Sequence, residues 1–153
     1  MRNTAKLSTT LSGVAGEYFV AAELSRRGYI ASITLRNTRG IDILVANEKA
    51  TKSAGIQVKT NQDRKKEWIL NQKAEDNYAE NLFYVFVNLN DLATLPSYHI
   101  VPSQVVAEYC RRTHSEWLAL PGKKGNEHKD NPVRKFADLQ NMYLDRWDVL
   151  ALD

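Results

Sequence analysis

The feature that most limits how this chain can fold is the stretch Leu82 to Leu89, LFYVFVNL. Its apolar residues run almost without interruption, whereas a strand with one face in water alternates apolar and polar residues. The stretch is also rich in β-branched and aromatic residues, which favour strands. We therefore expect a strand that is buried on both faces near the centre of a sheet, with Phe83, Tyr84 and Phe86 in the core.

Helical and strand patterns alternate along the rest of the chain. Apolar residues recur at helical spacing from Ser12 to Arg27, between Ser12 as N-cap and Gly28 as stop signal. Strands are predicted over Tyr29 to Leu35, Ile41 to Ala46 and Gly55 to Thr60, with a short strand at Trp68 to Leu70 and a short helix near Lys73 to Glu80. After Leu89 the sequence predicts a strand in SYHIVPS, a helix capped by Ser103 over about Gln104 to Arg112, a turn-rich loop from Leu120 to Pro132 and a closing helix in FADLQNMYLDRWDVLAL.

This order predicts a single α/β domain, residues 1–153, with a mixed central sheet flanked by helices. We expect the core to span about residues 12–102, followed by a C-terminal helical extension over about 103–153. The three tryptophans, Trp68, Trp117 and Trp147, are interpreted as packing residues.

Composition excludes several classes of protein. No apolar run approaches the roughly 20 residues that span a bilayer, so we expect no membrane partner. The start of the chain, MRNTAKLSTTLSG, lacks the apolar segment of a secretory signal. The single Cys110 cannot form an internal disulfide, and one cysteine with three scattered histidines argues against a thiolate zinc site. These features predict a cytoplasmic protein.

Charge is distributed unevenly along the chain. Residues 1–60 hold nine Lys/Arg and four Asp/Glu, a balance of +5, whereas residues 61–153 hold twelve and fourteen, a balance of −2. The two balances sum to the net charge of +3. A basic first half suits a phosphate-rich partner such as DNA.

Three polar residues interrupt two of the predicted strands. Asp42 lies among Ile41, Ile43 and Leu44, and Gln57 and Lys59 flank Val58. Because alternate strand residues share a face, Gln57 and Lys59 point the same way. A turn centred near residues 50 and 51 would place Asp42 across from Lys59, so that the three polar side chains converge at one end of a hairpin.

This convergence has two interpretations. A carboxylate and an amide oxygen are hard ligands of the kind that Mg²⁺ or Mn²⁺ accepts, and an adjacent ammonium can orient or help to deprotonate an attacking water. Alternatively, Asp42 and Lys59 form a cross-strand ion pair on a solvated face, worth roughly 0–1 kcal/mol. The triplet alone does not decide between them.

The helix before the hairpin adds a second carboxylate. In GVAGEYFVAAELSRRGY, Glu17 lies in the first turns and is preceded by Gly13 and Gly16. A glycine-flanked helical Glu, a Gly-x-Asp at the start of a strand and a Gln-x-Lys on the next strand together resemble the PD-(D/E)xK nuclease superfamily. The core order of that superfamily is helix, three strands, helix, strand. The resemblance covers about residues 12–90 and is strongest to small bacterial endonuclease-like proteins.

The resemblance implies a role for each of four residues. Asp42 would be a metal ligand, although Gly40-Ile41 replaces the proline that usually precedes it. Gln57 takes the acidic position, Lys59 would be the catalytic lysine, and Glu17 would reach the metal directly or through water. An amide at position 57 supplies an oxygen but no charge, which lowers the expected affinity for Mg²⁺ or Mn²⁺.

Further polar residues flank this motif and are candidates for contacts with nucleic acid. Basic side chains suit the phosphate backbone, and the neighbouring polar ones suit the edge of the site. The alternative is a solvated loop. The candidates are Arg36, Asn37 and Arg39 before the motif, and Thr60, Gln62, Arg64, Lys65 and Lys66 after it.

Three functions fit the sequence. The first is a Mg²⁺- or Mn²⁺-dependent nuclease that hydrolyses DNA phosphodiester bonds. The second is a nuclease-like module that has lost cleavage and binds nucleic acid or protein, which the Gln57 substitution favours. The third is an ion-paired interaction protein with no nucleic-acid role. A homodimer is compatible with the first function, although no stretch specifies an interface.

Overall fold

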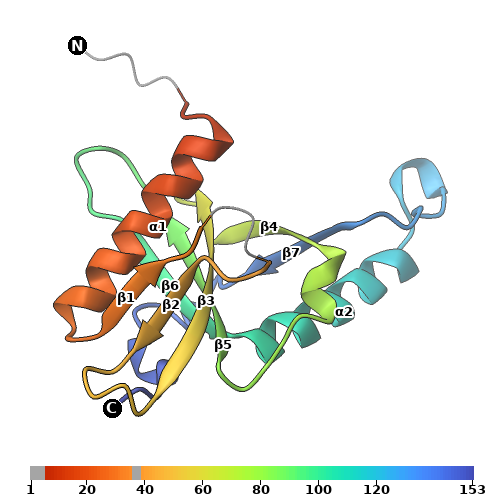
Figure 1. The fold of residues 1–153 in the computed structure, drawn as a ribbon. Coiled ribbons are helices and arrows are strands. Elements are labelled where there is room, and N and C mark those ends of the chain that lie inside the picture. The colour runs from red at the N-terminus through yellow and green to blue at the C-terminus, as the bar shows by residue number, and fades with distance from the viewer. Residues whose placement is uncertain (1–5, 36–38) are drawn as a thin grey trace.

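A five-stranded mixed sheet forms the centre of the computed structural model, which describes residues 6–35 and 39–153 (Figure 1). Its strands lie in the order β1 (Ile30–Ile33), β2 (Ile43–Ala46), β3 (Ser53–Asn61), β5 (Leu82–Asn88) and β6 (Ser97–Pro102). Only β3 and β5 are parallel neighbours, and the other pairs are antiparallel. The expected mixed α/β architecture is therefore confirmed.

The strand expected from the apolar run is β5, and all seven of its residues are buried. It pairs with β3 on one side and β6 on the other. Phe83, Val85 and Val87 pack into a cluster on one face of the sheet, whereas Tyr84 and Phe86 belong to a cluster on the other. Because both faces of β5 are covered, none of its side chains points into water, and the sequence shows no alternation of polar residues.

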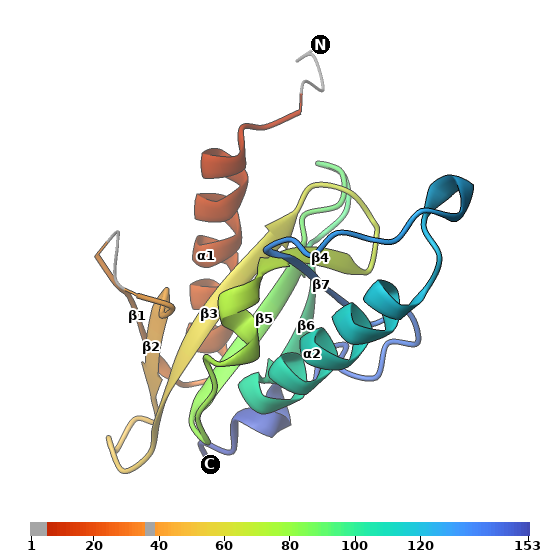
Figure 2. The same ribbon diagram turned by 90° about the vertical axis from the view of Figure 1, so that its right-hand side faces the viewer.

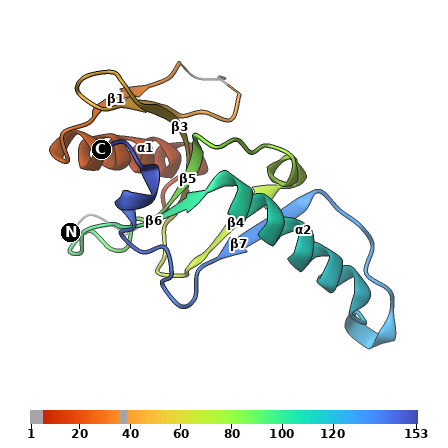
Figure 3. The ribbon, with the colours of Figure 1, turned by 90° about the horizontal axis from the view of Figure 1, so that it is seen from below.

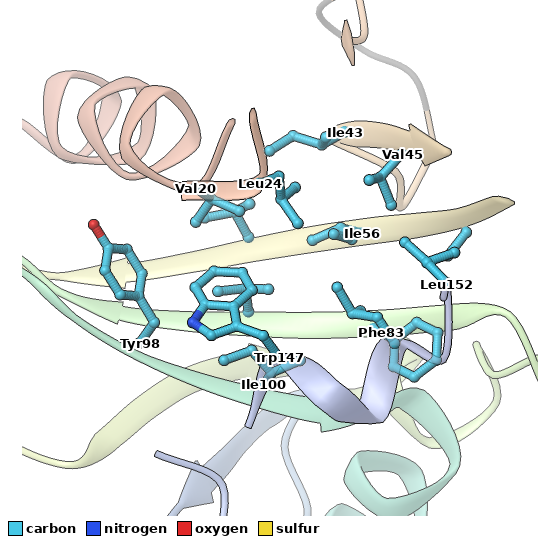
Figure 4. Close-up of a cluster of buried hydrophobic side chains, with 14 of the residues drawn as sticks. Val20, Leu24, Ile43, Val45, Ile56, Phe83, Tyr98, Ile100, Trp147 and Leu152 are labelled. Atoms are coloured by element: carbon cyan, nitrogen blue, oxygen red, sulfur yellow. The ribbon is translucent and has the colours of Figure 1, made fainter. Parts of the chain in front are cut away.

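The helix α1 (Thr9–Arg26) covers one face of the sheet (Figure 3). Its buried residues, Ser12, Gly16, Val20 and Leu24, are four apart and line a single stripe. Val20 and Leu24 pack against Ile43, Ile56 and the C-terminal turn η3 (Trp147–Leu150), as Figure 4 shows. Phe19 lies outside the stripe and is 40% exposed.

The opposite face carries α2 (Ser103–Ala119) and a two-stranded sheet of β4 (Glu67–Asn71) and β7 (Val133–Ala137) (Figure 2). Trp68 of β4 and Phe136 of β7 lie against Phe86 of the central sheet, with ring centroids 5.0 and 4.7 Å from it. This aromatic layer fills the space between the two sheets. The site described below lies on this same face.

Helix boundaries differ from the sequence expectation at two places because a different side chain serves as cap or anchor. α1 begins one turn earlier than expected, since Ser8 accepts from Leu11 N–H and Ser12 is buried. α2 runs seven residues beyond Arg112, to Ala119, and Ser103 is its first residue. The Ser103 hydroxyl does not cap the helix, since it bonds the backbone of Ala79 instead.

The expected closing helix is wrong. Arg134 and Phe136 alternate with exposed residues and pair with β4, so this segment forms β7. The carboxylate of Asp138 then accepts from the N–H groups of Met142 and Tyr143, which fixes a turn in place of a helix. The remaining helical turns are short 3-10 segments, namely η1 (Gln72–Glu75) within the expected helix near Lys73 to Glu80, η2 (Lys123–Gly125) in the loop, and η3.

A search of the described ranges for a membrane-spanning helix finds none of sufficient length and apolarity.

Candidate active site

Asp42 lies immediately before β2, and its backbone is fixed from both sides. Its N–H donates to the carbonyl of Ile56 at 2.8 Å, and its carbonyl accepts from Thr34 N–H at 2.9 Å. The side chain is fixed as well, because Oδ2 accepts from the backbone N–H of Val58 at 2.7 Å. This bond from Val58 therefore holds the Asp42 carboxylate against β3.

The backbone around Asp42 has the pattern of a β-bulge. Ile43 pairs with Ile56, yet Asp42 also donates to the Ile56 carbonyl, so two successive residues share one partner. Bulges interrupt strand pairing and re-aim a side chain, and they are over-represented next to active sites. Here the carboxylate takes the place of a ladder carbonyl as acceptor for Val58.

The hairpin register differs from the expected one. Asp42 opposite Lys59 would set Ile43 against Val58, but Ile43 pairs with Ile56, a shift of two residues. The turn centre lies earlier because the Asn47 side chain accepts from the N–H groups of Thr51 and Lys52. An even shift preserves the faces. Asp42 therefore lies beside residues 56–58 of β3.

Gln57 and Lys59 share the face of β3 that looks away from α1. Ile56 and Val58 pack into the cluster under α1, and side chains alternate along a strand. The parallel neighbours of Gln57 and Lys59 on β5 are Tyr84 and Phe86. Both polar residues are half-buried, so they border the aromatic layer and do not project into water.

The side-chain oxygen of Gln57 is buried and has no hydrogen-bond partner among the described residues. Leaving such an acceptor unpaired costs about 1–3 kcal/mol, and native structures contain few of them. A cation or a bound water would remove this cost. Gln57 Oε1 is thus the feature of this site that most clearly calls for a ligand.

Tyr84 forms the wall beside Gln57 and is 1% exposed. Burial, with smaller contributions from the Cys110 thiol and the Asp42 carboxylate, raises the pKa of its phenol to about 12. The phenol is therefore neutral at physiological pH. The sequence predicted only a core role for Tyr84.

Glu17 lies on α1, which covers the opposite face of the sheet from Gln57 and Lys59. It is half-buried, and the preceding Gly16 lies against the side chain of Thr60. A Cβ on Gly16 would come 1.9 Å from Thr60 Oγ1. Glu17 is thus close in the chain to a contact with β3, but its role as a ligand stays a prediction.

A divalent cation would have to use few protein ligands here. Within residues 6–35 and 39–153 no group of three His, Cys, Asp or Glu side chains could hold a metal ion. Asp42 and Gln57 supply one carboxylate and one unpaired amide oxygen, which fit Mg²⁺ or Mn²⁺, since such ions usually keep several waters and bind substrate phosphate. The residues present therefore fit the ion expected from the sequence.

Several of the residues expected to contact nucleic acid have structural partners. The Gln62 amide makes two hydrogen bonds to the backbone of Leu7, at 2.7 and 2.8 Å, and Thr60 packs against Gly16. Arg64 forms an exposed ion pair with Asp91 at 2.6 Å. Contact of DNA by Gln62, Thr60 and Arg64 therefore stays a prediction.

The remaining basic candidates lie at the edge of the same region. Lys65 is exposed, Lys66 is half-buried, and Arg39 is exposed in the turn before Asp42. Arg36 and Asn37 lie outside the described residues. Asn77, which the sequence did not single out, approaches the same turn, since its Nδ2 would be 2.8 Å from a Cβ on Gly40.

Comparison with solved structures shows the fold. The structure is similar to the bacterial homing endonuclease I-Ssp6803I, with a TM-score of 0.58 and 13% sequence identity over 96% of this chain and 93% of that chain. It also matches Hjc, a Holliday junction resolvase from the archaeal hyperthermophile Archaeoglobus fulgidus, with a TM-score of 0.49 and 13% identity over 82% and 84% of the two chains. No family model and no curated protein matches the sequence. This chain therefore shares the fold of that homing endonuclease, a mixed central sheet flanked by helices, as the sequence predicted.

Proposed function

We propose that this protein is a metal-dependent nuclease that hydrolyses DNA phosphodiester bonds. The observation that carries the proposal is the unpaired, buried oxygen of Gln57, next in the chain to the residue that binds Asp42. The Asp42 carboxylate is fixed on Val58 N–H, and the neighbouring Gln57 oxygen is buried without a partner. The nuclease fold supports the same conclusion.

Asp42 and Gln57 would hold Mg²⁺ or Mn²⁺, and Glu17 would complete the protein part of the site. When bound, the ion supplies Lewis-acid stabilisation of the charge that develops on the phosphate and acidifies water. Lys59, on the same face as Gln57, orients the attacking water or takes up its proton. The Tyr84 phenol, which is neutral, excludes bulk water from this side of the site.

DNA would approach over the turn before β2 and the loop after β3. Arg39, Lys65 and Lys66 would contact the phosphate backbone. The side chains of Arg36, Asn37, Thr60, Gln62 and Arg64 complete the expected contact set. We also propose that two copies of the chain pair, which would allow both strands of a duplex to be cut.

Cleavage of plasmid and single-stranded DNA with Mg²⁺ or Mn²⁺ tests the proposal. Wild type is compared with Asp42→Asn and with Lys59→Met, which removes the ammonium and keeps the length of the chain. We expect Lys59→Met to lose about a hundredfold or more in cleavage rate, the usual scale for loss of a proton-transfer group, and Asp42→Asn to lose at least as much because the metal ion loses its charged ligand. Equal rates for wild type and both variants would overturn the proposal.

A second function, binding without cleavage, is favoured by one observation. The described residues hold no group of three carboxylate, imidazole or thiol ligands, and the motif has an amide at Gln57. This function predicts DNA binding that weakens steeply with salt and does not require a divalent ion. Binding of that kind, together with no cleavage by wild type under any metal, would establish it.

A further inference from the structure

A cavity lies away from the candidate active site, lined by residues of α2, β7 and the loop that joins them. Figure 2 shows how these elements are arranged. Its volume is about 520 Å³, within the range of roughly 300–1,000 Å³ that small-molecule sites occupy. Helix α2 contributes the side chains of Tyr109, Thr113, His114 and Trp117, which are spaced to share one face. The facing wall consists of Glu67, Asn131, Val133, Arg134 and Lys135.

The two aromatic walls of this cavity are held in place. Trp117 contacts two imidazoles, stacked on His114 at 5.5 Å and edge-on to His128 at 4.1 Å between ring centroids. Tyr109 packs on Phe136 at 4.8 Å. Rings that are fixed before a ligand arrives lose little conformational freedom when it binds.

The charges around the cavity are already balanced. Both Lys135 and Arg134 have an anionic partner, so the cavity offers little net charge to attract a free phosphate. Lys135 pairs with Glu67 at 3.0 Å and Arg134 with Glu75, and His114 lies 2.7 Å from an Asp130 oxygen. A neutral ligand is therefore favoured over an anion.

Polar groups remain to give such a ligand its orientation. The Asn131 oxygen accepts from Val133 N–H, which leaves its amide NH₂ group to donate. Lys135 is exposed, and its ammonium has further donors beyond the bond to Glu67. A neutral, planar molecule with hydrogen-bonding edges matches two aromatic walls and these donors.

We propose that this cavity binds a nucleobase, namely an unstacked base of a DNA strand. Stacking on an aromatic ring accepts any base, whereas the donors at the rim recognise its edge. Trp117 would thus bind a base in addition to the packing role expected from the sequence, whereas Trp68 and Trp147 are buried at 2% and 5% exposure. The choice of a base over another neutral heterocycle rests on the proposed nuclease function.

The three indole N–H signals of the protein test this proposal directly in a ¹H–¹⁵N spectrum. Addition of thymidine or deoxyadenosine to wild type is expected to shift the Trp117 signal and to leave those of Trp68 and Trp147 in place. A Trp117 signal that does not move at about 10 mM nucleoside, which excludes millimolar affinity, would overturn the proposal.

Variants extend the test to DNA. Loss of one base–aromatic stack predicts that Trp117→Leu weakens binding of a single-stranded oligonucleotide by roughly 5- to 150-fold, and that Trp117→Phe restores most of it. Equal binding by wild type and Trp117→Leu would contradict the proposal. If Trp117→Leu fails to fold, the nucleoside titration of wild type decides.

Asp42→Asn separates this proposal from the nuclease proposal. That variant is expected to shift its Trp117 signal with nucleoside as wild type does, because Asp42 does not line the cavity. Loss of cleavage with an intact nucleoside response therefore supports both proposals. If wild type shifts its Trp117 signal with nucleoside but cuts no DNA, the nuclease proposal alone is contradicted.

Discussion

The carboxylate of Asp42 accepts a hydrogen bond from the backbone N–H of Val58 at 2.7 Å. Through this bond one residue serves both the fold and the candidate site. It gives the N–H of Val58 an acceptor, and it holds the Asp42 carboxylate against the strand that carries Gln57. Stability and chemistry at Asp42 are therefore separable by substitution.

Asp42→Ala leaves the N–H of Val58 without its acceptor in a largely buried position, 9% exposed. We expect the free energy of unfolding to fall by about 1–3 kcal/mol, the cost of an unsatisfied buried donor. Asp42→Asn keeps an oxygen acceptor and should lose less. Urea unfolding of both variants checks the difference, and equal losses would show that the Val58 bond contributes nothing.

Gln57→Leu removes the unpaired oxygen and keeps the bulk of the side chain. Because the lost oxygen is buried without a partner among the described residues, we expect the free energy of unfolding without metal to rise by up to about 1–3 kcal/mol. Mn²⁺ binding, measured by calorimetry, should be lost. Gln57→Glu is the matched variant and should bind Mn²⁺ roughly tenfold more tightly, since affinity rises with ligand charge. Unchanged Mn²⁺ affinity in Gln57→Leu would exclude the amide as a ligand.

Gly16→Ala places a methyl group 1.9 Å from Thr60 Oγ1, at the contact between α1 and β3. Overpacking of this kind costs about 1–3 kcal/mol of stability. Gly13→Ala, in the same helix, has nothing within 4 Å of its new Cβ and should stabilise by roughly 0.5–1 kcal/mol. Thermal unfolding of the pair compares them, and shifts of the same sign would contradict the packing at Gly16.

Much of the sheet could be predicted from the sequence because burial leaves a pattern. The apolar run from Leu82 to Leu89 identified β5, and Gly28, at a positive φ of 92°, ended α1 as expected. The alternation at Gln57 and Lys59 placed both on one face, and an even register error left that face unchanged.

Other features depend on contacts that no local pattern records. The register of the hairpin follows from hydrogen bonds of Asn47 within the turn, and β7 forms because it pairs with the distant β4. The buried pair of His99 Nδ1 with Asp138 Oδ2, 2.6 Å apart, joins residues 39 positions apart. Tyr84 likewise reaches the site only because β5 lies parallel to β3.

Stability should fall steeply at alkaline pH. Burial raises the pKa values of Tyr84 and Tyr98 from 10.0 to about 12. Between these values the unfolded chain loses protons that the folded protein retains, so each phenol lowers stability by up to about 1.4 kcal/mol per pH unit. Tyr84→Phe should flatten this decline. Urea unfolding from pH 8 to 12 measures the slope, and identical slopes for the variant and wild type would refute this account of Tyr84.

The central claim, a divalent cation between Asp42 and Gln57, is tested most directly by crystals of wild type grown with Mn²⁺. Anomalous diffraction should reveal a peak roughly 2.0–2.2 Å from an Asp42 carboxylate oxygen and from Gln57 Oε1. The peak should be absent from Gln57→Leu crystals grown in the same way. Wild-type crystals with Mn²⁺ bound elsewhere, and none between these two side chains, would contradict the claim.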